Sequence, residues 1–308
     1  MASPESSSPA DQSGASLLGP LAVLALGACA MGISPIFVRL ASPEVGPFAS
    51  AFWRVALALP VLYGWAYAEG RRAALAGPAR KPALLAGAAF AGDLVFWHLS
   101  IMATSVANAT FFATTAPVFV VLATWLVLRQ RVARRTLGGL SLCLAGGAAL
   151  VVESMNVAPG RLLGDAFGLV TATFFATYLL FMARARERGG AAQITFVSTA
   201  ATAAILLVVA LLFDRERFWA SRAETWAALA GLAFVSQVAG QGLLAVALGR
   251  LPAVFSSLVI FLEAVFAAAA GWIVLGEALS AVQYAGGALI FLGIALARPR
   301  RQDREDPR

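Results

Sequence analysis

The sequence predicts an all-α polytopic membrane protein, in which ten transmembrane helices form two inverted five-helix repeats. The first observation is composition: the 308 residues are 60% apolar and 13% charged, with a mean hydropathy of +0.81. Soluble domains are roughly 45–50% apolar and about 25% charged. The second is that apolar runs of about 20 residues, enough to cross a hydrocarbon core, recur along the chain. The third is an internal repeat.

Apolar runs between clusters of charged residues, Gly or Pro define the predicted spans in chain order. They cover residues 17–38, 47–67, 82–102, 105–128, 136–152, 164–183, 194–213, 225–248, 252–275 and 279–297. No Lys or Arg precedes the first span and similar spans follow it, so we expect a retained helix and not a cleaved signal. We expect Pro35 and Pro117 to kink the first and fourth spans.

The polar ends are predicted to lie outside the two repeats. Residues 1–16 are expected to form a disordered N-terminal tail, and residues 299–308 a charged C-terminal tail. The first repeat then covers 17–152 and the second 161–298.

The positions of the cations predict the orientation in the membrane. If both termini are cytoplasmic, most of the 23 Lys and Arg residues fall in cytoplasmic loops and in the C-terminal tail. This bias predicts an integral protein of a bacterial inner membrane with both ends inside. The net charge of +7 is spread over these loops, so no nucleic-acid partner is expected. Cys29 and Cys143 fall within predicted spans and form no metal motif, so we expect no metal and no cofactor.

The repeat emerges when the sequence is shifted by 147 residues, which brings "PVFVVLATWLVLRQ" (117–130) onto "AVFAAAAGWIVLGE" (264–277). The matched pairs include Val118 with Val265, Phe119 with Phe266, Trp125 with Trp272, Gly139 with Gly286 and Gly146 with Gly293. Each copy contains five spans, an odd number, so the second copy enters the membrane from the opposite side. Inverted repeats are typical of alternating-access transporters, which bind substrate near the midplane between the copies.

Three motifs also resemble a known family: "ISPIFVRLA…GPFASAFWR", "TSVANATFFATTAPVFVVLATWLVL" and "LEAVFAAAAGWIVLGEALSAVQYAGG". Together they are similar to the EamA-type members of the ten-helix drug/metabolite transporter superfamily, over about residues 17–298. Two positions depart from that pattern: Glu263-Ala264 stands where the family usually has Glu-Pro, and Arg129-Gln130 where it usually has Gly-Glu. We expect the first departure to straighten the ninth helix, because a proline would remove a backbone hydrogen bond.

The resemblance implies a cargo of small metabolites, such as amino acids, amines, nucleotide-linked compounds or drugs, moved usually outward and often against protons. The expected partners are therefore a small-molecule substrate, protons and membrane lipids. The expected assembly is a monomer or a homodimer.

Four ionisable residues lie inside predicted spans: Arg54, Asp93, His98 and Glu263. Each costs roughly 2.5–3.5 kcal/mol at the bilayer centre, so each is expected to serve a function or to be paired. Asp93 and His98 are about 140° apart on a helix and cannot form a close pair. Asp93 is expected to share its face with Phe96 and Trp97, an arrangement that suits a cationic or amino-bearing cargo.

The sequence leaves alternatives open for these ionisable residues. For Asp93 and Glu263 it favours a function, because a carboxylate in lipid has few structural uses. His98, with an intrinsic pKa near 6.5, is either a coupling residue or a neutral imidazole that forms a hydrogen bond between helices. Arg54 either recognises cargo or forms a structural ion pair with one of the two acids.

Uncharged polar residues extend the predicted central cavity, although each of them could also form only an interhelical hydrogen bond. Asn108 and Thr115 lie seven residues apart on one expected helix face, and Gln237 and Gln241 lie four apart. The full set of predicted substrate-binding or coupling residues is Asp93, His98, Glu263, Arg54, Trp97, Asn108, Thr115, Tyr178, Gln237, Gln241 and Ser256.

These residues predict a secondary active transporter, not an enzyme, that exports a small metabolite by alternating access, with Asp93 or Glu263 exchanging a proton for cargo. A lipid flippase of the same superfamily is one alternative, because a lipid headgroup could also use Arg54. An intramembrane enzyme is another, but the chain contains no His-Glu-x-x-His, Gly-x-Ser-x-Gly or phosphate-loop motif. A channel would need a continuous polar stripe, whereas the polar residues cluster near mid-depth.

Overall fold

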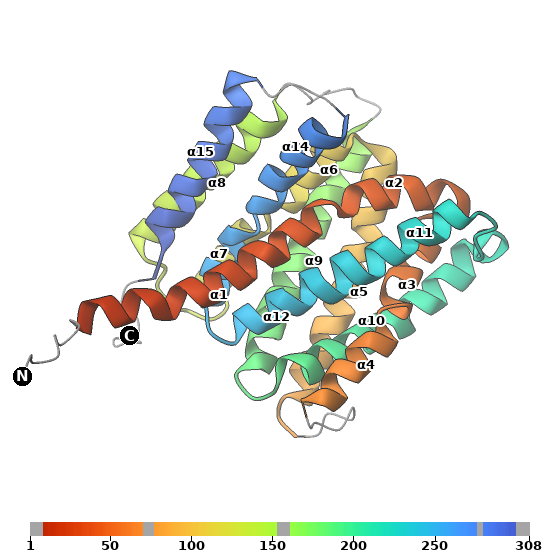
Figure 1. The fold of residues 1–308 in the computed structure, drawn as a ribbon, viewed down its shortest axis with the longest axis horizontal. Coiled ribbons are helices and arrows are strands. Elements are labelled where there is room, and N and C mark those ends of the chain that lie inside the picture. Colours follow the sequence, from red (N-terminus) through yellow and green to blue (C-terminus); the bar gives the residue numbers. More distant parts are fainter. Residues whose placement is uncertain (1–8, 70–76, 153–160, 276–279, 300–308) are drawn as a thin grey trace, which may run out of the picture.

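The computed structural model describes residues 9–69, 77–152, 161–275 and 280–299, and within these ranges the chain is a bundle of helices without a strand (Figure 1). The first half contains α1 (Pro9–Gly32), α2 (Ser34–Val45), α3 (Pro47–Ala56), α4 (Leu59–Ala68), α5 (Arg80–Ala103), α6 (Val106–Ala113), α7 (Ala116–Leu126) and α8 (Arg134–Val151). α1 with α2, α3 with α4, and α6 with α7 are broken helices that each fill one predicted span.

The second half contains α9 (Leu162–Arg186), α10 (Ala191–Phe213), the 3₁₀-helix η2 (Arg215–Arg217), α11 (Ala223–Gly231), the π-helix η3 (Leu232–Gln241), α12 (Gly242–Leu248), α13 (Ala253–Val259), α14 (Leu262–Leu275) and α15 (Ala281–Ala297). Seven of the described spans are long and apolar enough to cross a membrane, and 253–269 and 281–297 are shorter apolar helices. The predicted all-α membrane fold is confirmed.

One predicted boundary is wrong. The sequence placed residues 1–16 in a disordered tail, but α1 begins at Pro9. A proline is compatible with the first turn of a helix, where its missing N–H has no partner to lose. Residues 1–8 and 300–308 lie outside the described part of the chain.

Prolines account for three of the helix breaks. A turn interrupts the α-helix at Ile33 before Pro35, and at Thr114 and Thr115 before Pro117, as predicted. A third break, at Leu57 and Ala58, precedes Pro60, which the sequence analysis did not single out. Each proline lacks the N–H that the preceding turn would bond.

The expectation of a straight ninth helix is wrong. α13 and α14 are separated at Ile260 and Phe261, although Ala264 stands where a proline was expected. The Ile260 amide donates to the Ser257 carbonyl at 3.2 Å, and the Phe261 amide to the Leu258 carbonyl at 3.1 Å. This tight 3₁₀ turn keeps the backbone hydrogen-bonded, so the break needs no proline.

The crossing of α8 and α15 confirms that the two repeats are inverted. A Cβ on Gly139 would lie 2.5 Å from the Gly293 carbonyl oxygen, and one on Gly146 would lie 2.5 Å from that of Gly286. The two helices are therefore antiparallel. In the repeat, Gly139 is equivalent to Gly286 and Gly146 is equivalent to Gly293. In the structure Gly139 contacts Gly293 and Gly146 contacts Gly286. A twofold axis in the membrane plane requires this exchange of partners.

Other helices of each half also pack against helices of the opposite half. α5, from the first half, packs against α9 and α10 of the second, while α12 and η3 pack against α1. α8 and α15 lie side by side at one edge of the bundle, and α1 begins at the same end at which α15 finishes (Figure 1). The space between the halves is thus enclosed by helices from both repeats.

The neighbouring glycines of α15 test this crossing. A Cβ on Gly286 would lie 2.7 Å from the Gly146 carbonyl oxygen, whereas one on Gly287 would contact nothing within 4 Å. We expect Gly286→Ala to destabilise the protein by about 1–3 kcal/mol, because the helices must separate to admit the methyl group. Gly287→Ala should leave stability unchanged or raise it by up to about 1 kcal/mol through helix propensity. Thermal unfolding of the purified protein measures both, and equal midpoints would contradict the close crossing.

Candidate functional site

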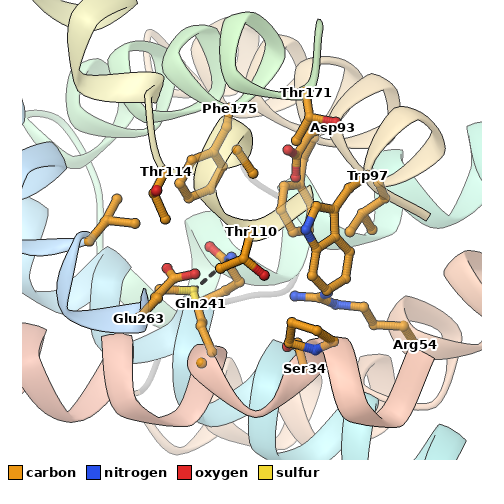
Figure 2. A pocket seen from close by; sticks show the side chains of 17 residues that line it. Ser34, Arg54, Asp93, Trp97, Thr110, Thr114, Thr171, Phe175, Gln241 and Glu263 are labelled. Atoms are coloured by element: carbon orange, nitrogen blue, oxygen red, sulfur yellow. Dashed lines mark hydrogen bonds between the residues drawn. The ribbon is translucent and has the colours of Figure 1, made fainter. Parts of the chain in front are cut away.

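A small, partly open cavity of about 50 Å³ lies between the two halves near the middle of the bundle. α1, α2, α3, α5 and α6 of the first half contribute to its wall, as do α9, η3 and α14 of the second. Figure 2 shows three charged side chains around it: Arg54, Asp93 and Glu263. The helix breaks at Ile33, Thr114 and Ile260 are next to residues of the wall, so irregular backbone borders the cavity.

The Arg54 side chain is buried, at 3% exposure, and is held by neutral groups. Its Nε donates a hydrogen bond of 3.3 Å to Gln237 Oε1, and the Gln237 amide nitrogen donates to Thr199 Oγ1 at 3.2 Å. The guanidinium carbon lies 5.5 Å from the Trp97 ring centroid and 5.8 Å from that of Phe90. These aromatic faces attract the cation and fix its position at the wall.

The structural ion pair that the sequence left open for Arg54 is not formed. An ion pair within 4.0 Å joins Arg217 and Asp214, at 3.9 Å, and neither residue lines the cavity. Asp93 and Glu263 line the same cavity as Arg54, but neither carboxylate has an oxygen within 4.0 Å of an Arg54 nitrogen. In Figure 2 the guanidinium points toward the cavity, with Asp93 above it and Glu263 to its left.

The two carboxylates come from opposite halves, Asp93 from α5 and Glu263 from α14. Figure 2 shows Asp93 beside Thr171, with Glu263 on the other side of the cavity. Asp93 is 6% exposed, and Glu263 Oε1 is buried without a hydrogen-bond partner in the described chain. A buried carboxylate without a paired cation is costly, so each acid can be stabilised by a proton or by a cation that enters the cavity.

The aromatic wall beside Asp93 differs from the expected one. Trp97 lies in it as expected, with Phe90 and Phe175. Phe96 faces away, stacked on Phe174 with ring centroids 5.7 Å apart. The reason is that α9 packs along that side of α5 and covers Phe96, which a single helix could not predict.

Hydroxyl groups that the sequence analysis missed complete the wall. Ser34, Thr110, Thr114 and Thr171 line the cavity together with the predicted Gln241. The hydroxyls of Ser34, Thr110 and Thr171 and the Gln241 carbonyl oxygen are buried and form no hydrogen bond within the described chain. Buried polar groups are nearly always paired, so these atoms suit a polar molecule in the cavity. The four-residue spacing of Thr110 and Thr114, one helix face, was the available signal.

His98 lies behind the cavity wall and does not line it. It is fully buried, and its Nδ1 donates to the Leu94 carbonyl, 2.8 Å away on the same helix. Its ring meets the Trp97 ring edge-on at 5.3 Å, and Nε2 forms no hydrogen bond to the described residues. Of the two alternatives that the sequence left open for His98, the interhelical hydrogen bond is not formed within the described chain, because the imidazole bonds its own helix.

Five other predicted site residues also lie outside the cavity lining. Gln237 holds Arg54 from behind, and Tyr178 packs against Phe90, with ring centroids 4.7 Å apart. Ser256 is fully buried. Thr115 Oγ1 donates to the Phe112 carbonyl at 2.6 Å, and Asn108 Nδ2 donates to Asp165 at 3.1 Å. The helix break at Thr114 and Thr115 interrupts the continuous face that the sequence assigned to Asn108 and Thr115.

Within the described ranges, no group of three or more His, Cys, Asp or Glu side chains is placed to hold a metal ion. The chemistry of the cavity is instead that of one cation, two acids, aromatic faces and hydroxyls. Such a set can bind a molecule and exchange protons.

The sequence is similar to known membrane transport proteins, and this similarity shows its family. The family model described as "EamA-like transporter family" matches residues 18–152 and again 162–298. One curated relative, an uncharacterized transporter of Archaeoglobus fulgidus, is 25% identical over 273 residues, which cover 86% of this chain and 92% of the relative. A second uncharacterized transporter of that organism is 27% identical over 198 residues, covering 64% of this chain and 69% of the relative.

A solved crystal structure has a similar fold, with a TM-score of 0.73 and 19% sequence identity, over 90% of this chain and 97% of that one. The matched family model spans both halves of the bundle, and the membrane-length apolar helices make the chain an integral membrane protein. The chain belongs to the EamA-like transporter family.

Proposed function

We propose that this protein is a secondary active transporter that exports a small polar metabolite, an amino acid or an amine, by alternating access and in exchange for protons. The observation that supports it is the cavity between the inverted halves, which contains one cation and a carboxylate from each half. Inverted repeats can rock against each other around such a central site. The helix breaks beside the cavity supply the points at which the helices can bend.

The lining of the cavity supports a polar cargo. An apolar molecule would leave the hydroxyls of Ser34, Thr110 and Thr171 unpaired, which costs about 1–3 kcal/mol for each buried group. An ammonium group suits the space beside Asp93 or Glu263, and the Trp97 face can support it by cation–π attraction. These features favour an amino acid or amine over an apolar drug or the acyl chain of a lipid.

Proton exchange follows from the charges of the cavity. Arg54 carries one positive charge, and the two carboxylates together carry two negative charges when both are ionised. The remaining negative charge can be neutralised by a proton or by a cationic cargo. Because both compete for the same carboxylates, release of cargo on one side favours proton uptake there, and this competition couples the two fluxes.

The setting we propose is a bacterial inner membrane with both termini in the cytoplasm. The distribution of Lys and Arg supports it, because Arg80, Arg134 and Arg135 begin helices at the end of the bundle assigned to the cytoplasm. The cargo itself is to be found by comparing the metabolites released by cells with and without the protein.

Neutralising the acids tests the coupling. In reconstituted vesicles, Asp93→Asn and Glu263→Gln should lower flux driven by an imposed pH gradient by about tenfold or more, since a charge-assisted hydrogen bond contributes about 1.5–3 kcal/mol. Glu187→Gln, which neutralises an exposed acid outside the cavity, is the matched control and should transport normally. Wild-type flux in Asp93→Asn would remove this residue from the site. Flux that a pH gradient neither drives nor biases would exclude proton exchange.

Arg54→Lys tests whether the guanidinium itself recognises cargo. Lysine keeps the charge but lacks the planar group that stacks on Trp97 and bonds Gln237. We expect KM to rise by roughly tenfold with a smaller change in maximal rate. Arg215→Lys, at an exposed position, is the control. An unchanged KM would show that only the charge of Arg54 matters or that it does not contact cargo.

A further inference from the structure

Three carboxylates outside the cavity link the two halves at one end of the bundle. They are Glu44, near the end of α2, Asp165, in the first turn of α9, and Asp214, which follows α10. None of them lines the cavity. Each accepts hydrogen bonds from residues of the opposite repeat.

Glu44 of the first half covers the beginning of α11 in the second half. Its Oε1 accepts hydrogen bonds from the Ser221 amide at 2.6 Å, the Ser221 hydroxyl at 2.6 Å and the Arg222 amide at 3.2 Å. Its Oε2 accepts one from the Thr225 hydroxyl. Amides at the start of a helix have no partner within the helix and favour an anion, so this one carboxylate satisfies several donors.

Asp214 of the second half makes the reverse connection, to the beginning of α3 in the first half. Its Oδ2 accepts from the Phe48 amide at 2.7 Å and from the Ala49 amide at 3.0 Å. The side chain is 3% exposed. It packs against Gly46, whose φ of +83° and missing Cβ permit the approach.

Asp165 of the second half binds the connection between α5 and α6 in the first. Its Oδ1 accepts from the Thr104 hydroxyl at 2.8 Å and from Asn108 Nδ2 at 3.1 Å. Ser100 strengthens this contact by donating its hydroxyl to the Gly164 carbonyl at 2.8 Å. Glu44, Asp165 and Asp214 thus belong to loops or helix ends on the same side of the bundle.

At the opposite end of the bundle, the described contacts of charged side chains are made by cations. Arg135 Nη2 of the first half donates to the Leu296 carbonyl of the second at 3.1 Å, and Arg186 Nε donates to the Ala245 carbonyl at 2.7 Å within the second half. The charged contacts described between the halves thus use carboxylates at one end and a guanidinium group at the other.

We propose that Glu44, Asp165 and Asp214 form a latch that holds this end of the cavity closed and must release before the cavity opens there. The proposal rests on the alternating access of the proposed function, because an opening at this end requires the two halves to separate where the latch joins them. Charge-assisted hydrogen bonds are about twice as strong as neutral ones, so the latch biases the protein toward the state closed at this end. In the proposed orientation this is the extracytoplasmic end.

Sided chemical labelling tests the latch without a known cargo. A single cysteine is introduced as Ala113→Cys, in the wall of the cavity, after replacement of Cys29 and Cys143 by alanine. A membrane-impermeant maleimide is then applied to each face of the membrane. A separate Arg215→Cys reporter, at an exposed position beside the latch, identifies the face on which the latch lies.

The double variant Glu44→Gln/Asp214→Asn should raise labelling of the cavity cysteine from the latch side by at least about fivefold. It should lower labelling from the other side, because the open states exchange. Glu224→Gln removes an exposed charge beside the latch and should change neither rate. Asp165→Asn alone should produce a smaller shift in the same direction.

Two outcomes would overturn the latch. Unchanged labelling from the latch side would show that the carboxylates do not hold that end closed. Labelling that rises from both sides would show that the variants only loosen the fold. The test is independent of proton exchange: a reciprocal shift without flux driven by a pH gradient would preserve the latch and reject the coupling, whereas gradient-driven flux with unchanged labelling would do the reverse.

Discussion

The central constraint on this fold is the placement of three charged side chains inside an apolar bundle that offers them little water. A charged side chain inside a membrane is tolerated when it faces a cavity or a partner, and Arg54, Asp93 and Glu263 meet at one cavity. Neutral groups position the cation: Trp97 and Phe90 present their faces and Gln237 an amide oxygen. Since Arg54 is not locked in an ion pair with either acid, all three charges remain directed at the same space.

The inverted duplication supplies this space but not its chemistry. Repeat-equivalent glycines let α8 and α15 approach closely, and helices of each half pack against those of the other. The charged residues are present only once: α10, the counterpart of α3 and α4, and η3, the counterpart of the middle of α5, contain no charged residue, and the 147-residue repeat places Ala116 against Glu263. Duplication thus built a symmetric frame, and single-copy substitutions made an asymmetric site within it.

Broken helices connect this frame to the function we propose. In a bilayer, irregular backbone is tolerated where it is buried in protein or lines a cavity, and the breaks at Ile33, Thr114 and Ile260 satisfy that condition. The break before Glu263 forms without a proline, through a hydrogen-bonded 3₁₀ turn. At one end of the bundle, the latch carboxylates join the same halves that these breaks allow to bend. The opening of the cavity that we propose is therefore opposed by the latch at that end of the bundle.

The membrane fold, the order of the spans and the inversion of the repeats could be predicted without coordinates, because they follow from hydropathy, an odd number of spans in each repeat and the register of the repeat. Arg54, Asp93, Trp97, Gln241 and Glu263 were predicted as site residues and line the cavity. The signal was the presence of polar and aromatic groups within apolar runs. The sequence could not find Ser34, Thr110 and Thr171, which on an isolated helix resemble ordinary interhelical contacts. Only the tertiary structure placed His98 behind Trp97 and turned Phe96 away. The reason is that the direction of a side chain in a bundle depends on which helix covers each face, and that is decided by contacts between residues far apart in the chain.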